Sequence, residues 1–515
     1  MARNFCAVDV GTRSVRAGVF AEDGRQLSRD VVAITVHSAR ASHGEYSSEQ
    51  IWQAVCTAVR RALDASGLAP SDISGIAFDA TCSLVLTGGV PLGPDGRDTI
   101  AWFDHRALAE ARDCTATGHP LIDRHGGSMS PEMQTPKLLW LKRNRRDLWD
   151  ALTRAEDLTD HLTTRAKGAP VRSACTLTAK WAFAPDLGGW QQDFLAAVGL
   201  SDLSDRAGLT DPIVPPGSRA GGLSETSATE LGLAAGTPVA AGMVDAFAGT
   251  LGGLASAQDP AATLALITGT SNCVMSMTPD PCAAPGLWGP LQNAILPGHF
   301  VTEGGQSAAG AVLDHVLASW PWPDDAAPPD HAQVLARLEQ LVARDGAAFG
   351  RGIDVLPDFN GNRSPLADPL ALGVISGLSL DRSLVGLCAL YWRTAVALAC
   401  GVRQIVDQFE AAGHPVNALT IAGGLTRSDL LTQLFADCCD LPALRPDAPD
   451  TVMLGTAMAA AAGSGLYPDL PSAAQAMRRG VTRFEPEAAG RYDRDHAAFR
   501  LMQRHRADLR DLATG

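Results

Sequence analysis

The chain has 515 residues, of which 46% are hydrophobic and 19% charged, and a formal net charge of −14 at pH 7. This composition is that of a globular protein, and the length exceeds what one hydrophobic core usually supports, so we expect two domains. The negative charge argues against a nucleic acid or an anionic membrane surface as a partner and favours small molecules.

The cysteines and the N-terminal stretch indicate an intracellular protein. The eleven cysteines include no Cys-x-x-Cys pair, which argues for reduced thiols and against a disulfide framework or a structural zinc site. Asp9 comes before a long apolar region can form, so we expect no signal peptide. The stretch 231–258 is long enough to raise the question of a membrane span, but Pro238, Asp245 and its glycines argue against one. We therefore expect a cytoplasmic location and no membrane partner.

Residues 5–20 have the pattern of a β-hairpin. Two short apolar runs, 5–10 and 15–20, flank the sequence Gly11-Thr12-Arg13-Ser14, which is typical of strand, tight turn and strand. Such a turn can offer backbone N–H groups to phosphate oxygens, and Asp9 at the end of the first strand could hold a hydrated Mg²⁺. The alternative is an ordinary hairpin without a ligand.

The following segments alternate between helix and strand and end in polar clusters. Helical spacing over 48–65 precedes a strand over 73–78. Open α/β sheets bind ligands at strand ends, so Asp79 and Asp104 are candidates to accept hydrogen bonds from sugar hydroxyls, with Trp102 offering a flat face. The alternatives are that Trp102 is a core aromatic and that Asp104 caps a solvated helix.

Three charged residues stand alone in small or apolar surroundings. Lys180 could reach a substrate oxygen, although a single lysine is more often on the surface. Asp245 follows a strand-like stretch, 237–241, and lies among glycines, which suits a general base that takes a proton from a bound hydroxyl. The alternative is that Asp245 only caps the next helix. Glu303 is expected near the N-terminus of a helix, where the helix dipole explains it as well as a ligand does.

Two later glycine turns repeat the pattern of the first. Apolar runs over 263–267 and 273–277 flank Gly269-Thr270-Ser271, which suggests an internal duplication in which each domain contributes one phosphate loop. A third turn, 421–428, follows a strand and opens a helix, so its glycines could lie against a nucleoside. The sequence contains no P-loop and no dinucleotide fingerprint, so nucleotide binding depends on these three turns.

The rest of the C-terminal half is expected to be architecture. Apolar residues recur at three- and four-residue steps from Asp381, the expected N-cap, to Gly413, the expected stop, which predicts a long buried helix. Residues 453–465 are rich in Ala and Gly and predict a close-packed helix. The charged residues after Phe484 predict a terminal surface helix.

Five motifs in this order resemble the FGGY family of carbohydrate kinases, which belongs to the actin/Hsp70/sugar-kinase superfold. They are Asp9-x-Gly-Thr, Gly242-Met-Val-Asp245-Ala, Gly269-Thr-Ser271, Glu303-Gly-Gly-Gln306-Ser and Ala422-Gly-Gly424, and the resemblance covers nearly the whole chain. Residues 78–85, 102–106, 130–134 and 359–369 look like the ribulokinase branch, and most like D-ribulokinases. The Gly-Gln-Met-His-Gly element of xylulokinases is missing at residues 79–85.

The resemblance implies a two-domain α/β ATPase fold with a cleft between the domains. Residues 1–248 would form an N-terminal domain with the sugar site and the first phosphate loop, and residues 249–515 a C-terminal domain with the nucleotide site. The implied cofactors are ATP and Mg²⁺, with Asp9 near the metal and Asp245 as the catalytic base.

The residues and the resemblance together predict two sets of contacts. The predicted sugar contacts are Asp79, Ala80, Trp102, Asp104, Arg106, Lys180, Asp245 and Glu303. The predicted nucleotide contacts are Gly11, Thr12, Arg13, Ser14, Gly269, Thr270, Ser271, Gly310, Gly423, Gly424 and Arg427. Arg13 stands where many members of the family carry a smaller polar residue.

The expected reaction is transfer of the γ-phosphoryl group of MgATP to the terminal hydroxyl of a ketopentose, with O5 of D-ribulose as the first choice. L-Ribulose and pentitols stay open, since a few hydroxyl contacts decide the epimer. The rivals are a sugar-independent conformational ATPase of the same superfold, against which the polar clusters at 79–83 and 102–106 argue, and a catalytically weak sugar sensor, against which Asp9 and Asp245 argue. A homodimer is allowed, and the oligomeric state stays open.

Overall fold

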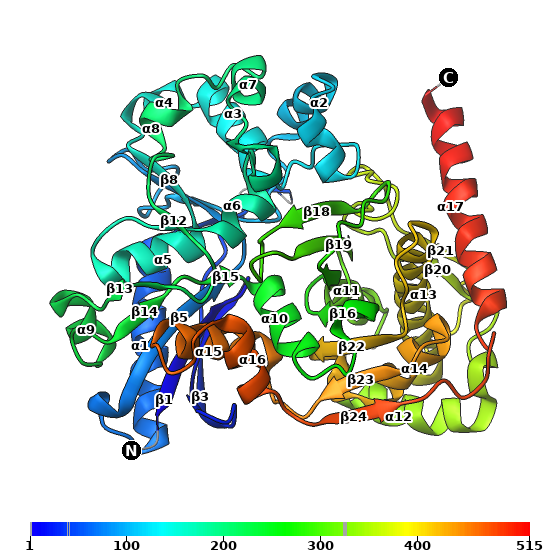
Figure 1. Cartoon of the computed structure of the whole chain (residues 1–515). Coiled ribbons are helices and arrows are strands. Elements are labelled where there is room, and N and C mark those ends of the chain that lie inside the picture. The colour runs from blue at the N-terminus through cyan, green and yellow to red at the C-terminus, as the bar shows by residue number, and fades with distance from the viewer. Residues whose placement is uncertain (1–2, 39, 41, 323–326, 515) are drawn as a thin grey trace.

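The computed structural model describes residues 3–38, 40, 42–322 and 327–514. Met1 and Ala2, which begin the predicted N-terminal domain, and Gly515, which ends the predicted C-terminal domain, lie outside the described residues. The described chain forms two α/β halves that lie side by side, each built on a seven-stranded sheet (Figure 1). The predicted two-domain α/β architecture is therefore present.

The first sheet places the predicted hairpin at its centre. Its order is β13-β14-β5-β1-β2-β3, and β15 also pairs with β5. Strand β1 is buried along its whole length, as expected of a strand that is covered on both faces. The strands are β1 (Asn4–Val10), β2 (Ser14–Ala21), β3 (Gln26–Ala33), β5 (Ile73–Ala80), β13 (Arg219–Gly222), β14 (Pro238–Ala240) and β15 (Met243–Val244), and the helices of this half are α1 (Ser48–Ser66), α5 (Leu158–Lys167) and α9 (Glu225–Leu231).

The segment between β5 and β13, together with β4 from before β5, builds a smaller layer beside the first sheet, at the top of Figure 1. It has a four-stranded sheet of its own in the order β4-β7-β6-β8, and its own apolar core around Leu138 and Trp149. Its strands are β4 (Glu45–Tyr46), β6 (Leu84–Thr87), β7 (Thr99–Ile100) and β8 (Arg154–Asp157), with the two-residue pairs β9 (Arg172–Ser173) and β12 (Ile213–Val214), and β10 (Phe183–Ala184) and β11 (Gly189–Trp190). Its helices are α2 (Leu108–Ala116), α3 (Gln134–Asn144), α4 (Arg146–Ala151), α6 (Ala174–Lys180), α7 (Gln192–Ala197) and α8 (Leu203–Arg206).

The second sheet repeats the arrangement of the first. Its order is β18-β19-β17-β16-β22-β23-β24, and β16 pairs antiparallel with β17 and parallel with β22, as β1 does with β2 and β5. The strands of the second half are β16 (Thr263–Thr268), β17 (Asn272–Thr278), β18 (Trp288–Gln292), β19 (Phe300–Gln306), β20 (Asp354–Leu356), β21 (Val374–Ser376), β22 (Ala418–Gly423), β23 (Ala443–Pro446) and β24 (Val481–Phe484). Its helices are α11 (Gly310–Ser319), α12 (His331–Asp345), α13 (Leu384–Ala411), α14 (Asp429–Cys439) and α17 (Asp493–Thr514). The repeat supports the predicted duplication.

Two helices, α10 (Asp245–Leu254) and α15 (Thr451–Gly463), cross between the two sheets. They approach so closely that a Cβ atom on Gly455 would lie 1.9 Å from the carbonyl oxygen of Ala248, and one on Gly252 would lie 2.1 Å from that of Thr451. Helix α15 and the short α16 (Leu470–Met477) also belong to the apolar core that contains Phe5 of β1. The boundary predicted after residue 248 thus falls inside α10, and late residues pack against the first sheet.

The long predicted helix is α13, and it runs through the core of the second half. It begins after Ser383, whose side chain caps it by accepting from the N–H of Gly386, so Asp381 is not its N-cap. Among the described residues, α13 alone is long and apolar enough to cross a membrane, but 83% of its most apolar window is buried in the protein, as in the core helix of a globular domain. Helix α17 packs along the outer side of this half (Figure 1). All eleven cysteines are free thiols.

Candidate active site

A cavity of about 660 Å³ lies between the two halves. The β1–β2 turn, the end of β5 and the start of α10 form one side, and the β16–β17 turn, the turn after β22 and the connector before α15 form the other. The predicted site residues that line it are Asp9, Gly11, Thr12, Trp102, Lys180, Asp245, Gly269, Thr270, Ser271, Glu303, Gly423, Gly424 and Arg427. A ligand in this cavity would therefore contact both sheets.

The first turn presents backbone to the cavity at Gly11 and Thr12. The N–H of Gly11 donates to the carbonyl of Ser14 at 3.0 Å and closes the turn. The Oγ1 of Thr12 accepts a hydrogen bond from Nε1 of Trp102 at 3.0 Å. Arg13 is exposed and, like Ser14, lies outside the cavity wall, so nucleotide contacts at these two positions stay a prediction.

The β16–β17 turn and the turn after β22 lie next to each other in the second half. The N–H of Gly269 donates to the carbonyl of Ser271 at 2.8 Å, and Gly310 lies behind this turn, with its N–H donating to the carbonyl of Gly269 at 3.0 Å. Gly310 thus supports the turn and does not line the cavity. Gly423 has a φ of +106°, and a Cβ there would lie 1.8 Å from the carbonyl oxygen of Thr268, so this turn requires glycine.

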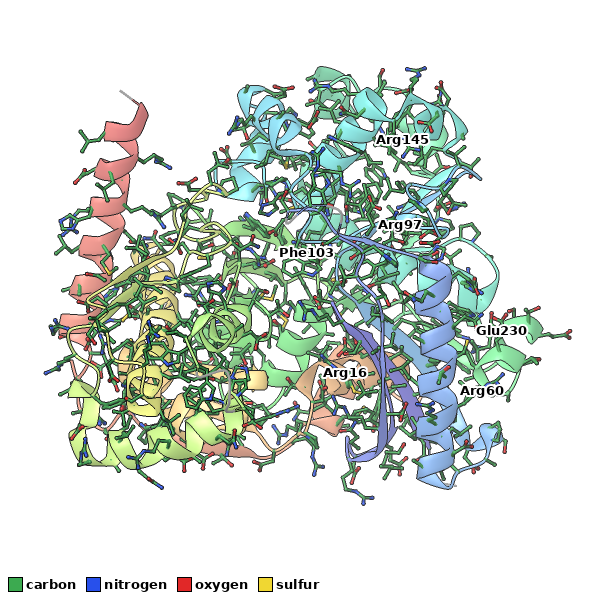
Figure 2. The ribbon with its side chains drawn as sticks, turned by 180° about the vertical axis from the view of Figure 1, so that it is seen from behind. Arg16, Arg60, Arg97, Phe103, Arg145 and Glu230 are labelled. Carbon is green, nitrogen blue, oxygen red and sulfur yellow. The ribbon has the colours of Figure 1, made fainter. Side chains whose placement is uncertain are left out.

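Asp9 lies at the end of β1 and is paired with Arg16. The two residues are partners in the β1–β2 register, and Nη1 of Arg16 lies 2.5 Å from Oδ2 of Asp9. Figure 2 shows Arg16 beside the strands of the first sheet. Burial raises the pKa of Asp9 to about 7, although the charge of Arg16 lowers it, and the nearby carboxylates Asp450 and Asp245 raise it further. The protonation of Asp9 therefore depends on the charge of Asp245.

Asp79 lies beside Asp9 on the neighbouring strand but does not reach the cavity. The two aspartates are register partners between β1 and β5. The side chain of Asp79 is fully buried and accepts a hydrogen bond from Oγ1 of Thr456 at 2.5 Å. Burial, first of all, and the charge of Asp9 raise the pKa of Asp79 well above its usual value. The predicted sugar contact of Asp79 is therefore corrected to a buried support behind Asp9.

Asp245 is the first residue of α10 and lines the cavity. Val244 occupies the N-cap position, and the Asp245 side chain accepts from the N–H of its neighbour Ala246, at 2.7 Å. The interpretation of Asp245 as a helix cap is thus wrong. Burial raises the pKa of this carboxyl, which makes its ionised form a stronger base.

Trp102, Lys180, Glu303 and Arg363 line the same cavity and form what we call the acceptor wall. Lys180 ends α6 with only 4% of its surface exposed, and its Nζ lies 4.4 Å from the ring centroid of Trp288, so it is not a surface lysine. Trp102 is mostly buried, yet its indole borders the cavity, so it is both a core residue and a wall residue. The wall offers two cations, one carboxylate and an aromatic face.

Glu303 lies in the middle of β19 and not at a helix N-terminus. The segment 302–306 is strand, and α11 begins only at Gly310. Oε1 of Glu303 accepts from Nη1 of Arg363 at 3.1 Å. The helical prediction for this segment and the dipole interpretation are therefore wrong, whereas the placement of Glu303 at the cavity agrees with its prediction.

Asp104 and Arg106 form a structural pair outside the cavity. The two oxygens of Asp104 accept from the N–H of Gly44 and from the backbone N–H, Nε and Nη2 of Arg106, at 2.8 to 2.9 Å. Arg106 also pairs with Glu45, as does Arg97, which is labelled in Figure 2. The prediction of sugar contacts at these two positions is thus corrected, and α2 begins only at Leu108. Ala80 is likewise buried and does not line the cavity.

Sequence reasoning missed two cations of the site. Arg16 could have been found, because a residue that follows Asp9 across a tight hairpin faces it on the adjacent strand. Arg363 lies in a loop of the second half and reaches Glu303 of the same half and Glu132 of the first half, at 3.1 and 3.3 Å. No local sequence pattern predicts such a contact between distant segments.

Comparison with known proteins gives matches over both halves. Residues 5–252 match the model of the N-terminal domain of the FGGY family of carbohydrate kinases, and residues 264–464 match that of its C-terminal domain. The chain is 38% identical to an FGGY carbohydrate kinase domain-containing protein of Danio rerio, over 99% of this chain and 98% of that protein. It is 32% identical to a D-ribulokinase of Saccharomyces cerevisiae, over 90% of this chain and 72% of that protein.

Solved structures give the same fold. The xylulose kinase from Rhodospirillum rubrum superimposes with a TM-score of 0.78 at 22% identity, over 98% of this chain and 99% of that chain. The glycerol kinase from Plasmodium falciparum, solved with ADP, gives a TM-score of 0.77 at 14% identity, over 98% of both chains.

Proposed function

Because the chain belongs to the FGGY family of carbohydrate kinases, and is as such an ATP-dependent carbohydrate kinase, we propose that its acceptor is a ketopentose, with D-ribulose converted to D-ribulose 5-phosphate. The observation that carries the choice of acceptor is the likeness to the yeast D-ribulokinase. A cytoplasmic location belongs to the same proposal.

Asp245 is the proposed general base. It lines the cavity at the start of α10, is free of a capping role, and has a raised pKa, so it suits removal of a proton from the attacking hydroxyl. Lys180 and Glu303 are proposed to hold the sugar, because both are buried and both line the cavity near Asp245. Trp102 would pack on the C–H groups of the sugar.

The three glycine turns are proposed to hold the nucleotide. Gly11 and Thr12 on one side and Gly269 and Thr270 on the other line the cavity with backbone, which suits contacts to phosphate oxygens. Arg16 lies beside Asp9 and can neutralise charge on the transferred group. Since phosphoryl transfer needs mainly positioning and charge neutralisation, these groups suffice for the chemistry proposed.

The residues beside Asp9 fit the Mg²⁺ that the family implies. Asp9 and Asp245 offer carboxylate oxygens, the ligands that Mg²⁺ prefers, whereas no cluster of three or more His, Cys, Asp or Glu side chains within the described residues could hold a metal alone. This donor set suits an ion held by one carboxylate, with phosphate oxygens and water completing its ligands. When bound, the ion would neutralise charge on the phosphates, and Asp9 would be the residue that holds it.

The test is ADP release from MgATP with D-ribulose, L-ribulose, D-xylulose, ribitol and no acceptor, with Asp245→Asn beside the native enzyme. Turnover with D-ribulose that is lost in the variant supports both the acceptor and the base. Greater turnover with L-ribulose or ribitol would replace D-ribulose by that acceptor. Turnover that is independent of any acceptor would contradict the kinase assignment and favour the conformational ATPase.

A further inference from the structure

Arg363 completes the acceptor wall beside Trp102, Lys180 and Glu303. It lies on the loop between β20 and β21, and neighbouring hydrogen bonds hold this loop firmly. The N–H and Oγ of Ser364 donate to the carbonyls of Gly305 and Gly286 at 3.1 and 2.9 Å, and Nδ2 of Asn362 donates to Asp358 at 3.0 Å. The guanidinium is therefore carried by a fixed backbone.

The charge of Arg363 is compensated from both halves of the protein. Its Nη1 lies 3.1 Å from Glu303 of the second half, and its Nη2 lies 3.3 Å from Glu132, which precedes α3 in the first half. Its guanidinium also lies 4.9 Å from the ring centroid of Trp288 and 5.9 Å from that of Trp102. A buried cation held by two carboxylates has no charge left for a third anion.

Arg363 also separates two cavities. It lines the large cavity and, with Glu132, His105, Asn362 and Trp288, a second one of about 30 Å³. That volume is enough for water but too small for a sugar carbon chain. The arginine side chain is thus a partition that prevents a ligand in the large cavity from extending into the small one.

We propose that Arg363 is a specificity-determining residue that ends the acceptor site and selects a neutral acceptor of limited chain length. The inference rests on the proposed function. A ketopentose fills the space in front of Arg363, and a longer ketose meets its guanidinium. An acidic acceptor such as an aldonate would bring a carboxylate to Glu303 and to a cation that is already paired, which leaves only Lys180 of the acceptor wall to compensate its charge, so it is a poorer acceptor than a neutral sugar.

The test compares Arg363→Lys with the native enzyme on D-ribulose, D-fructose and D-gluconate. Lysine keeps a positive charge for the two carboxylates but lacks the planar fork and is shorter, so the partition opens. We expect the ratio of kcat/KM for the six-carbon ketose over the five-carbon ketose to rise about tenfold, the size of effect that one methylene has on enzyme selectivity. The KM for ATP should stay within about twofold.

The matched control is Arg393→Lys. Arg393 is a buried arginine too, paired with Asp495 between α13 and α17 and absent from both cavities, so its replacement should change stability without changing the ratio. An unchanged ratio in Arg363→Lys, or native turnover of D-gluconate that matches D-ribulose, would overturn the inference. Glu132→Gln is a second test variant. It removes one carboxylate partner of Arg363, so the KM for the acceptor should rise while the KM for ATP stays unchanged.

Failure of the proposed function has a different signature. If the native enzyme phosphorylates none of the five-carbon acceptors, the ketopentose proposal falls. The role of Arg363 is then tested with whichever neutral acceptor the native enzyme uses, by comparing kcat/KM for that acceptor with kcat/KM for the same acceptor lengthened by one carbon. Calorimetric measurement of the binding of the ketose series is the second way to test it. A length preference identical in the native and Arg363→Lys proteins contradicts the inference there as well.

Discussion

Nε1 of Trp102 donates a hydrogen bond to Oγ1 of Thr12 across 3.0 Å, so the acceptor wall and the first glycine turn are joined directly. Trp102 comes from the segment before α2, and Thr12 from the β1–β2 turn. The backbone carbonyl of Thr12 is held as well, because it accepts from the hydroxyl of Tyr46 at 2.9 Å. Displacement of either residue should therefore affect both the acceptor wall and the first glycine turn.

Trp102→Phe keeps an aromatic ring and removes the donor. We expect the KM for ATP to rise about fivefold although Trp102 belongs to the acceptor wall, because one hydrogen bond contributes about 1 kcal/mol. Thr12→Val should raise the KM for the acceptor in the same way, and the double variant should be less than additive because the two changes remove one interaction. Trp140→Phe, at a position outside both cavities, is the control. Strict additivity of the two site variants would contradict the link.

Asp245→Asn should lower kcat by about 10²–10⁴-fold, which corresponds to about 3–5 kcal/mol of barrier. The midpoint of thermal unfolding should not fall, since the change removes a half-buried charge that burial disfavours and keeps the side-chain shape. Steady-state kinetics and a melting curve on the same preparation measure both quantities. A variant that retains more than a tenth of the native kcat would show that another group takes the proton.

Asp104→Asn should lower the stability of the protein and change its activity little, the opposite of the effects expected for Asp245→Asn. Asp104 is fully buried and accepts from four N–H donors, three of them on Arg106, so an amide there removes the buried carboxylate partner of Arg106 and leaves it only the less buried Glu45 among the carboxylates described. Breaking such a buried pair costs about 3–5 kcal/mol, and the melting temperature should fall by several degrees while the KM for the acceptor changes less than about threefold. A selective loss of acceptor affinity at native stability would restore Asp104 as a sugar contact.

Activity should fall on the acid side of neutrality. Burial raises the pKa of Asp9 to about 7 and also raises that of Asp245. A raised pKa keeps a carboxyl protonated up to a higher pH, and the proposed chemistry needs both carboxyls ionised, so kcat/KM should increase with pH up to about 7. The measurement is kcat/KM for MgATP between pH 5 and 9 at saturating D-ribulose, which reports the enzyme before MgATP binds. A profile that is flat between pH 5 and 8 would contradict this prediction.

Gly455→Ala should destabilise the protein by about 1–3 kcal/mol, because its Cβ would lie 1.9 Å from the carbonyl oxygen of Ala248 and push α15 away from α10. Gly424→Ala is a matched change in open space, with no atom within 4 Å of its Cβ. It should leave the melting temperature unchanged and act only on the KM for ATP, since Gly424 lines the cavity. Equal melting temperatures for the two variants would show that the helix crossing can relax.

Much of the fold could be predicted from the sequence because its signals are local. The two hairpins with glycine turns, the strand before Asp245 and the buried helix over 384–411 each follow from alternation, helical spacing or turn residues within a short window. Asp9, Asp245 and Lys180 were found at the cavity for the same reason, since each stands out against its immediate neighbours.

The errors concern the direction and the distant partners of side chains. Asp79 and Asp9 end adjacent strands, yet only Asp9 lines the cavity, and the sequence gives no sign of Thr456 as the partner of Asp79. Asp104 has a donor in Gly44 that lies 60 positions away. The glycines and the polar residues around Glu303 also fit a helix start, so the sequence predicts a helix where the structure has β19. Such pairings depend on tertiary packing, which no short window contains.

The position of Asp245 at the helix crossing has a mechanical consequence. Asp245 begins α10, the helix that touches α15 through backbone contacts between the two sheets. Any rotation of one half against the other about this crossing moves the outlying parts of each half furthest and the residues near the axis least. Lys180 and Trp102 on one side, and Glu303 and Arg363 on the other, would thus converge on an acceptor while the proposed base, Asp245, keeps its place.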